Sequence, residues 1–272
     1  MPEQLHAAGA GKEAAPITIG IAGLGNLGSE IARWLVASAP PRLRLVAAAD
    51  LDRDDVARRL GSLGASASAV ALRELPGQCD LVVECLAPEA AAELLDCCVD
   101  RGGIVVPLSV CVLLGRPDLI ERARASGTRL LVPSGAVAGV EALRAAAMGR
   151  IHSVKVRTSK PPAGVDAQAA PGRQKLFGGN ALEACEAFPR NVNISATLSL
   201  AGIGGERTEV EIWADPDLER NVHEIEIDSD STLVRIRIEN RPSRANPRSS
   251  AITANSVCAL LQALVDPVRI GS

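Results

Sequence analysis

Hydrophobic residues in the first half of the chain fall into short runs that alternate with segments of helical periodicity. The run Ile17 to Ala22 is apolar and rich in β-branched residues, and a cluster of glycines joins it to Ser29 to Ser38, where apolar residues recur at helical spacing. A second apolar run, Leu43 to Ala49, ends at Asp50, and Asp54 to Leu60 is predicted to be a short helix. The order strand, tight turn, helix, strand is that of a β-α-β unit.

The same alternation continues to about residue 133. Further strands are predicted at Leu81 to Glu84, Ile104 to Pro107 and Leu130 to Val132, with helices between them at Glu89 to Arg101 and Pro117 to Ser126. Strands that alternate with helices pair in parallel, because each helix carries the chain back across the sheet. The first half is therefore predicted to be α/β, with a Rossmann-type doubly wound parallel sheet.

After Pro133 the pattern changes, and strands outnumber helices. An Ala-rich helix is predicted at Gly135 to Gly149, followed by strands at Ser153 to Thr158, Ile194 to Ser199, Thr208 to Ala214, His223 to Ile227 and Leu233 to Glu239. Several of these strands alternate apolar and polar residues, which is typical of a sheet with one face in water. We expect a second, α+β domain with a mostly open sheet, a loop at Pro161 to Gly172, and a final apolar helix, Ser249 to Leu264, that packs on the first domain.

Composition and charge narrow the classes of partner. The chain of 272 residues has two Trp, two Phe and no Tyr, so it lacks the aromatic side chains on which nucleic-acid bases stack, and its formal net charge of -3 gives no broad basic surface. No apolar run reaches the roughly 18 residues of a membrane-spanning helix. We expect a small-molecule substrate and neither a nucleic-acid nor a membrane partner.

The cysteines and the first residues bear on the compartment. The seven cysteines include no C-x-x-C pair, which favours buried free thiols over disulfides or a metal site, and no metal is expected. The first 15 residues lack the apolar core of a signal peptide and are predicted to be a loose leader. A cytoplasmic location is expected.

The glycine cluster has the spacing of a dinucleotide-binding loop. In Gly23-Leu24-Gly25-Asn26-Leu27-Gly28 the first glycine permits a tight turn, the second lets a pyrophosphate approach the backbone, and the third lets the helix pack closely on the strand. The start of the helix adds free N–H groups and the positive end of its dipole. Such glycines also occur in purely structural turns, but the strand before them, the helix after them and Asp50 at the end of the next strand favour dinucleotide binding.

Asp50 also bears on the choice of dinucleotide. Its carboxylate is placed to accept hydrogen bonds from the adenosine ribose and to repel a 2′-phosphate, which favours NAD over NADP. Arg53 could instead pair with a 2′-phosphate, and Asp50 could be no more than an exposed carboxylate at a strand end. NAD is the expected cofactor, with NADP as the alternative.

A nicotinamide cofactor moves a hydride, and an enzyme that uses one needs a group to move a proton, for which histidine is the usual choice near neutral pH. Of the three histidines, His6 lies in the leader, and His152 begins a strand, where a surface or capping role is expected. His223 lies at the turn into a strand of the second domain, where a side chain can face an interdomain cleft. Position alone leaves a structural role for His223 open.

Several segments of the second half resemble the L-aspartate dehydrogenase family. They are Val132 to Gly139, Thr158 to Pro162, Phe188 to Gly202, Ala214 to Pro216, Asn221 to Ile225, and the tail from Glu239 to Ser243 with Asn246-Pro247. The segment Phe188 to Gly202 is the most specific, because few folds need two asparagines beside Pro189 followed by a run of small residues. Together with the glycine loop, the resemblance covers nearly the whole chain after residue 16.

The resemblance implies an activity and a set of site residues. The activity is NAD(P)-dependent and reversible oxidation of L-aspartate at its amine-bearing carbon to iminosuccinate, which is released as oxaloacetate and ammonia or delivered to pyridine-nucleotide biosynthesis. Asn193 and Ala136 are implied to contact the cofactor, and His223 to be the catalytic residue. Lys160 and Arg190 are candidate anchors for the dicarboxylate, although each could be an ordinary surface charge.

The resemblance leaves rival functions and a domain division to test. The rivals are a dehydrogenase of another amino acid or a sugar, and a non-catalytic protein that senses dinucleotides. The segment Val105 to Val112 and the short loop Pro161 to Gly178 depart from the family pattern and could alter the cleft. We expect a leader at 1–16, a dinucleotide-binding domain at 17–133 completed by the C-terminal helix 247–272, and a substrate and dimerisation domain at 134–246, with a homodimer formed through the open sheet.

Overall fold

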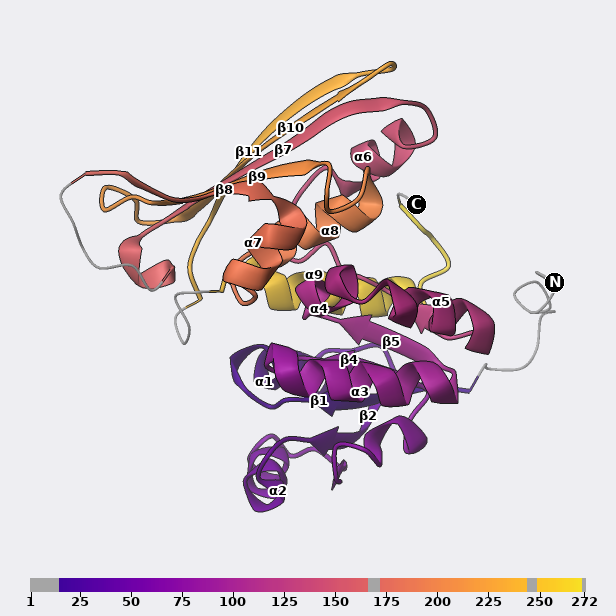
Figure 1. Ribbon diagram of the computed structural model, residues 1–272. Coiled ribbons are helices and arrows are strands. Elements are labelled where there is room, and N and C mark those ends of the chain that lie inside the picture. The colour runs from indigo at the N-terminus through magenta and orange to yellow at the C-terminus, as the bar shows by residue number, and fades with distance from the viewer. Residues whose placement is uncertain (1–14, 166–171, 244–248, 271–272) are drawn as a thin grey trace.

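The computed structural model describes residues 15–165, 172–243 and 249–270. The predictions for the leader up to residue 14, for His6, for part of the loop Pro161 to Gly172 and for Asn246-Pro247 lie outside these residues. Two sheets form separate layers, and helices fill the space between them and cover the lower sheet (Figure 1).

The first sheet has six strands in the order β3-β2-β1-β4-β5-β6, and every neighbouring pair is parallel. Its strands are β1 (Ile17–Ala22), β2 (Leu43–Ala49), β3 (Ser68–Ala69), β4 (Leu81–Glu84), β5 (Ile104–Pro107) and β6 (Arg129–Leu130). The order reverses between β1 and β4, which gives the sheet its switch point. The predicted doubly wound parallel sheet is confirmed.

Both faces of this sheet are covered by apolar helix faces. One face packs against α1 (Asn26–Ala37), α2 (Arg53–Ser62) and α9 (Ile252–Ala263), and the other against α3 (Pro88–Arg101) and α5 (Pro117–Ser126). The last helix therefore returns to the first sheet as predicted, with Ala254, Val257 and Leu261 buried in its core. A short helix, α4 (Val110–Gly115), and a 3-10 turn, η2 (Leu75–Gly77), complete this part.

Local sequence signals fix where several helices begin. The carboxylate of Asp52 accepts hydrogen bonds from the N–H groups of Asp54 and Asp55 at the start of α2, which satisfies donors that have no partner within the helix. Proline, which lacks an N–H and has a helical φ, is the first residue of α3 and of α5.

The second sheet has five strands in the order β11-β10-β7-β9-β8, in which only the β7–β9 pair is parallel. Its strands are β7 (Ile151–Lys160), β8 (Gln174–Asn180), β9 (Thr208–Ala214), β10 (Asn221–Ser229) and β11 (Leu233–Asn240). The helices α6 (Val140–Ala146), α7 (Ala181–Ala187) and α8 (Asn193–Ala201) lie on the face turned toward the first sheet, next to a 3-10 turn, η3 (Pro162–Gly164) (Figure 1). The predicted α+β part with an open sheet is confirmed.

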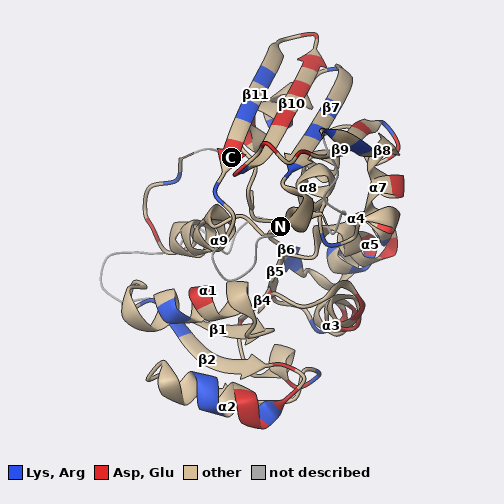
Figure 2. Ribbon diagram, turned by 90° about the vertical axis from the view of Figure 1, so that its left-hand side faces the viewer, with Lys and Arg blue, Asp and Glu red and all other residues tan. Residues whose placement is uncertain are grey.

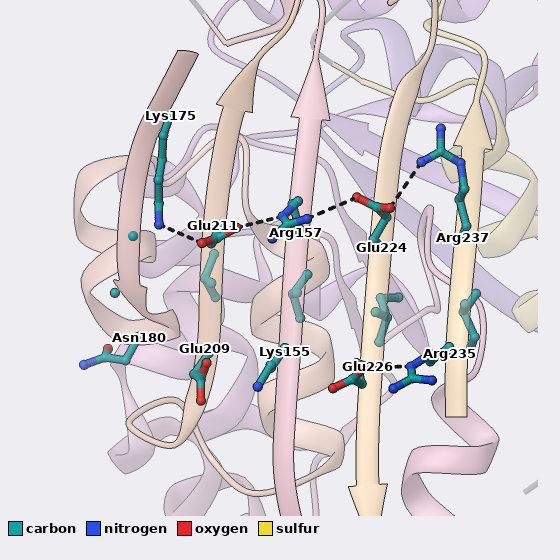
Figure 3. Close-up of a pocket in the computed structure, with 16 residues that line it drawn as sticks. Lys155, Arg157, Lys175, Asn180, Glu209, Glu211, Glu224, Glu226, Arg235 and Arg237 are labelled. Atoms are coloured by element: carbon teal, nitrogen blue, oxygen red, sulfur yellow. Dashed lines mark hydrogen bonds and ion pairs between the residues drawn. The ribbon is translucent and has the colours of Figure 1, made fainter. Parts of the chain in front are cut away.

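The open face of the second sheet carries charged side chains whose sign alternates from strand to strand, which is visible on β11, β10 and β7 (Figure 2). A continuous row of ion pairs crosses all five strands through Lys175, Glu211, Arg157, Glu224 and Arg237 (Figure 3). A second row includes the pair Arg235–Glu226, at 2.8 Å. The basic neighbours Lys175 and Arg157 lower the pKa of Glu211 to about 2.

The predicted strand at Ile194 to Ser199 is wrong, because this segment lies within helix α8. Its mixture of β-branched and small residues suggested a strand, but Thr197 and Ser199 each donate a side-chain hydrogen bond to the carbonyl four residues earlier, at 2.9 and 2.8 Å. These bonds let polar side chains lie inside a helix that is buried over residues 195–199.

Other elements differ from the prediction in length or were not predicted. The helix expected over Gly135 to Gly149 is restricted to α6, because Gly135 and Gly139 have φ values of +64° and +83°, which a continuous right-handed helix does not allow. Strand β8, helix α7, helix α4 and the two-residue strand β3 were not predicted. In α7, Asn180 and Glu183 form a capping box that the sequence spacing could have indicated.

All seven cysteines are free thiols, of which Cys98, Cys111 and Cys185 are buried and the others partly buried. Within the described ranges no helix is long and apolar enough to cross a membrane.

Candidate active site

A pocket of about 410 Å³ lies between the two layers. Its lining comes from the glycine loop, from the loops after β4 and β5, from the ends of β7 and β10, and from the starts of α8 and α9. Among its residues are seven that the sequence singled out: Asn26, Leu27, Ala136, Lys160, Arg190, Asn193 and His223. The structure therefore brings together residues that are up to 197 positions apart, from Asn26 to His223.

A larger hollow of about 920 Å³ lies on the open face of the second sheet. Most of the charged groups there are engaged in the two rows of ion pairs, and neither the glycine loop nor His223 borders it. We therefore take the smaller pocket as the candidate active site.

The glycine loop has the geometry that a dinucleotide needs. Gly23 has φ +86°, and a Cβ added to Gly28 would lie 1.9 Å from the carbonyl oxygen of Gly23, so helix α1 can lie this close to the loop only with glycine there. A Cβ added to Gly25 would meet nothing within 4 Å. Gly25 is the N-cap of α1 and provides no side-chain cap, so open space and uncapped N–H groups adjoin at the point where a pyrophosphate is expected.

Asp50 lies just after β2 and is tied to the glycine loop. One carboxylate oxygen accepts the N–H of Leu24 at 2.8 Å, and the other accepts the N–H of Leu51 at 2.8 Å. Arg53 donates from Nε to the carbonyl of Ala69 at 2.9 Å, which holds its guanidinium toward β3. Asp50 and the three glycines are not part of the pocket lining, which the loop enters through Asn26 and Leu27.

His223 lies on β10 and is 1% exposed. Its Nδ1 is 3.0 Å from the hydroxyl oxygen of Thr158 on the neighbouring strand β7, and its Nε2 has no hydrogen-bond partner among the described residues. Burial, together with the positive charge of Lys160, lowers the pKa of His223 to about 3. The imidazole is therefore neutral at physiological pH, and among the described residues no group occupies the hydrogen-bonding capacity of its Nε2.

Lys160 is buried at the end of β7, with 4% of its surface exposed. Its Nζ donates to the side-chain oxygen of Asn191 at 3.3 Å, and burial lowers its pKa to about 8. Arg190, the other predicted anchor, is exposed and lines the pocket as well. The pocket thus offers two cationic side chains, one of them desolvated, which suits an anionic ligand.

The two residues implied to contact the cofactor are held in place by hydrogen bonds. Asn193 is the first residue of α8, and its side-chain oxygen accepts the N–H of Cys111 at 3.1 Å. The carbonyl of Ala136 accepts a hydrogen bond from the side chain of Asn240 at 2.8 Å. Both lie in the pocket wall.

Some residues of the site were not predicted. Thr158 was noted only as the end of a predicted strand and as part of a family segment, although its spacing of two from Lys160 on one strand predicts that both face the same side. Glu84, a fully buried carboxylate beside the pocket, was noted only as a strand end. His152 forms a surface pair with Asp230 at 2.8 Å, which confirms its predicted surface role.

Two family models match the chain. One, described as aspartate dehydrogenase, C-terminal, covers residues 141–264. The other, described as homoserine dehydrogenase, NAD binding domain, covers residues 23–133.

Two relatives with similar sequences and one similar solved structure are aspartate dehydrogenases as well. L-aspartate dehydrogenase 3 of Bordetella bronchiseptica is 40% identical over 93% of this chain and 97% of its own length, and L-aspartate dehydrogenase of Bradyrhizobium diazoefficiens is 40% identical over 90% of this chain and 91% of its own length. The crystal structure of aspartate dehydrogenase from Thermotoga maritima matches 94% of this chain and 99% of that chain, with a TM-score of 0.75 and 26% identity. The chain belongs to the L-aspartate dehydrogenase family.

Proposed function

We propose that the protein is an NAD-dependent L-aspartate dehydrogenase whose catalytic residue is His223. The observation that carries this proposal is the juxtaposition of three features in one pocket: a neutral histidine whose Nε2 has no partner in the described part of the chain, a buried lysine, and a wall that continues to the glycine loop. Family membership supports the same substrate and reaction.

Each residue of the pocket has its own proposed role in the reaction. The nicotinamide cofactor, when bound, accepts the hydride from the Cα of aspartate. Lys160 and Arg190 bind the two carboxylates of the substrate, and neutral His223 accepts through Nε2 the proton of the water that attacks iminosuccinate. His223 returns that proton to the nitrogen of the resulting carbinolamine, whose C–N bond then breaks to release ammonia and leave oxaloacetate. Binding of the dianion raises the proton affinity of both His223 and Lys160, because an opposite charge then lies near each of them.

The cofactor site favours NAD over NADP. The carboxylate of Asp50 lies where the adenosine ribose of a dinucleotide is expected, and its charge opposes a 2′-phosphate. Arg53, the residue that could reverse this preference, is engaged with the carbonyl of Ala69. Gly23, Gly25, Asn26, Leu27, Gly28, Ala136 and Asn193 make up the rest of the proposed cofactor site.

A steady-state assay of the purified protein tests the proposal. We expect L-aspartate to reduce NAD with a higher kcat/KM than NADP, and other amino acids and sugars to give little reduction. Absence of aspartate-dependent NADH absorbance would support a non-catalytic dinucleotide sensor, whereas faster turnover of another amino acid or a sugar would support a different dehydrogenase.

The open face of the second sheet is proposed as the contact with a second copy of the chain. It carries five cationic groups (Lys155, Arg157, Lys175, Arg235, Arg237) and four carboxylates (Glu209, Glu211, Glu224, Glu226). Because these charges nearly balance and largely pair within the sheet, a second copy can cover the face without strong repulsion.

The domain division and the cellular setting are also proposals. We place the dinucleotide-binding unit at 17–133 with the C-terminal helix, and the catalytic unit at 134–246; limited proteolysis that cuts near residue 133 supports this division, and cuts confined to other sites contradict it. We further propose a cytoplasmic enzyme that supplies iminosuccinate to pyridine-nucleotide biosynthesis. Cell fractionation tests the location, and unchanged cellular NAD content after gene deletion contradicts the pathway.

A further inference from the structure

Glu84 is a fully buried carboxylate at the edge of the pocket. It is the last residue of β4, where it lies beside Ala22 of β1 and Pro107 of β5 in the sheet. Its exposed fraction is 0%, and none of the ion pairs among the described residues includes it. Because a buried charge is costly without compensation, this residue needs a structural or functional reason.

Four hydrogen-bond donors surround its two oxygens. Oε1 accepts the N–H of Leu86 at 2.7 Å and the hydroxyl of Ser109 at 2.9 Å, and Oε2 accepts the N–H groups of Leu108 and Ser109 at 3.1 and 2.9 Å. Burial raises the pKa of Glu84, and the hydrogen bonds from these donors act in the opposite direction. Three of the four donors are backbone N–H groups, which cannot accept a hydrogen from a protonated carboxyl, whereas the Ser109 hydroxyl can also donate to the carbonyl of Leu86, at 3.2 Å. The three fixed N–H donors fit the ionised carboxylate.

The donors belong to the two loops that form one wall of the active site. Leu86 follows β4, Leu108 and Ser109 follow β5, and all three line the pocket together with Asn193 and His223. These loops leave the carboxyl ends of strands next to the switch point of the sheet, where ligands of such sheets bind. One carboxylate thus fixes both loops relative to each other.

The charge of Glu84 has a consequence for the cofactor. The nicotinamide ring is cationic when oxidised and neutral when reduced, and its reactive end must lie in this pocket if His223 is to act on the substrate. The negative charge of Glu84, behind the pocket wall, lowers the energy of a cationic nicotinamide ring nearby and leaves a neutral ring almost unaffected.

We propose that Glu84 is a positioning residue of the active site, which fixes the two loops at the nicotinamide end and by its buried negative charge favours binding of NAD⁺ over NADH. This inference rests on the proposed function, because it assumes that a nicotinamide dinucleotide occupies the pocket.

Calorimetric titration of the full chain with NAD⁺ and with NADH tests the inference without any turnover. In Glu84→Gln, which keeps the size and removes the charge, we expect the Kd for NAD⁺ to rise roughly three- to tenfold more than the Kd for NADH. Ser109→Ala, which removes one donor and keeps the charge, should change both constants by the same factor.

Glu84→Asp provides the second variant if Glu84→Gln does not fold. It keeps the charge and shortens the reach to the loops, so both affinities should fall while the wild-type ratio of the two constants is kept. Two results would contradict the role of Glu84 but not the proposed function. One is a ratio of the two Kd values in folded Glu84→Gln that equals the wild-type ratio, and the other is a ratio in Glu84→Asp that differs from it. A wild-type protein that binds neither dinucleotide contradicts both this inference and the proposed function.

Discussion

At the scale of single residues, Lys160 is the group whose burial has the clearest consequence for binding. If Lys160 anchors a substrate carboxylate, Lys160→Met should raise KM for aspartate at least tenfold, about 1.4 kcal/mol, and leave the Kd for NAD unchanged. Arg58→Met is the control, because Arg58 is exposed on α2 and lies neither in the pocket nor on the proposed contact face. Steady-state kinetics of the two variants test this role, and an unchanged KM for aspartate in Lys160→Met would show that Lys160 does not bind a substrate carboxylate.

The same lysine predicts a pH dependence. Burial lowers the pKa of Lys160 to about 8, so its positive charge is complete at pH 6 and is lost as the pH rises through about 8. The inhibition constant of succinate, a dicarboxylate without an amine, should therefore rise between pH 7 and pH 9 in the wild type. In Lys160→Met this rise should be absent; a wild-type constant that is independent of pH contradicts the assignment.

Sequence reasoning singled out Lys160, Arg190 and His223, which line the pocket, but not their protonation states or the residues that hold them in place. His223, Lys160 and Asn193 were identified because family segments mark them. Their environment was not predictable from the sequence. The low pKa of His223 and the desolvation of Lys160 depend on the packing around strands β10 and β7, which are far apart in the sequence but neighbours in the sheet. Thr158 was missed for a related reason, since a threonine on a strand becomes significant only when its partner across the sheet is known.

At the scale of elements, the glycine loop predicts two different outcomes for two similar changes. Gly28→Ala should weaken NAD binding and lower the melting temperature, because its Cβ would lie 1.9 Å from the carbonyl oxygen of Gly23. Gly25→Ala should weaken NAD binding but leave the melting temperature nearly unchanged, because its Cβ meets no protein atom within 4 Å. Titration with NAD and thermal unfolding of both variants give the comparison.

Gly61→Ala is the control for these substitutions. Gly61 lies in helix α2, and nothing lies within 4 Å of the added Cβ, so alanine should stabilise the protein by about 0.5 to 1 kcal/mol and leave NAD binding as it is. Tight NAD binding by Gly25→Ala would contradict the placement of the pyrophosphate at this loop.

The elements of the first sheet were predicted more accurately than those of the second. Strands β4 and β5 and helix α5 have the predicted bounds, because apolar runs bordered by proline, glycine or charge leave little choice. Helix α8 was taken for a strand, since the hydroxyl groups of Thr197 and Ser199 donate to carbonyls of the same helix and give no polar face. Strand β8 has only two apolar side chains apart from its glycines, Leu176 and Phe177, and these are adjacent, so its sequence shows no alternation.

At the scale of the whole molecule, the open sheet predicts the state of assembly. Light scattering should give the mass of a dimer for the wild type, and Arg157→Glu should give a monomer, because it places a third carboxylate between Glu211 and Glu224 at the centre of the charged row. Arg58→Glu, an equal change of charge on the exposed side of α2, should remain dimeric. A monomeric wild type, or a dimeric Arg157→Glu, contradicts this interface.

The candidate active site is a property of the whole molecule, because neither layer contains it alone. The glycine loop and the loops after β4 and β5 come from the first layer, and Lys160, Asn193 and His223 come from the second. The sequence predicted an interdomain cleft in general terms, but the distance between residues such as Asn26 and His223 along the chain left its shape undetermined.

The most direct test of the central claim is the turnover of L-aspartate by His223→Ala, measured beside wild type and His152→Ala. We predict that His223→Ala binds NADH with wild-type affinity but forms NADH from aspartate roughly 10²- to 10⁴-fold more slowly, the range expected for loss of a general acid or base. His152→Ala should behave as wild type, because His152 pairs with Asp230 at the surface. Near wild-type turnover by His223→Ala would contradict the account of this pocket as a catalytic site built around His223.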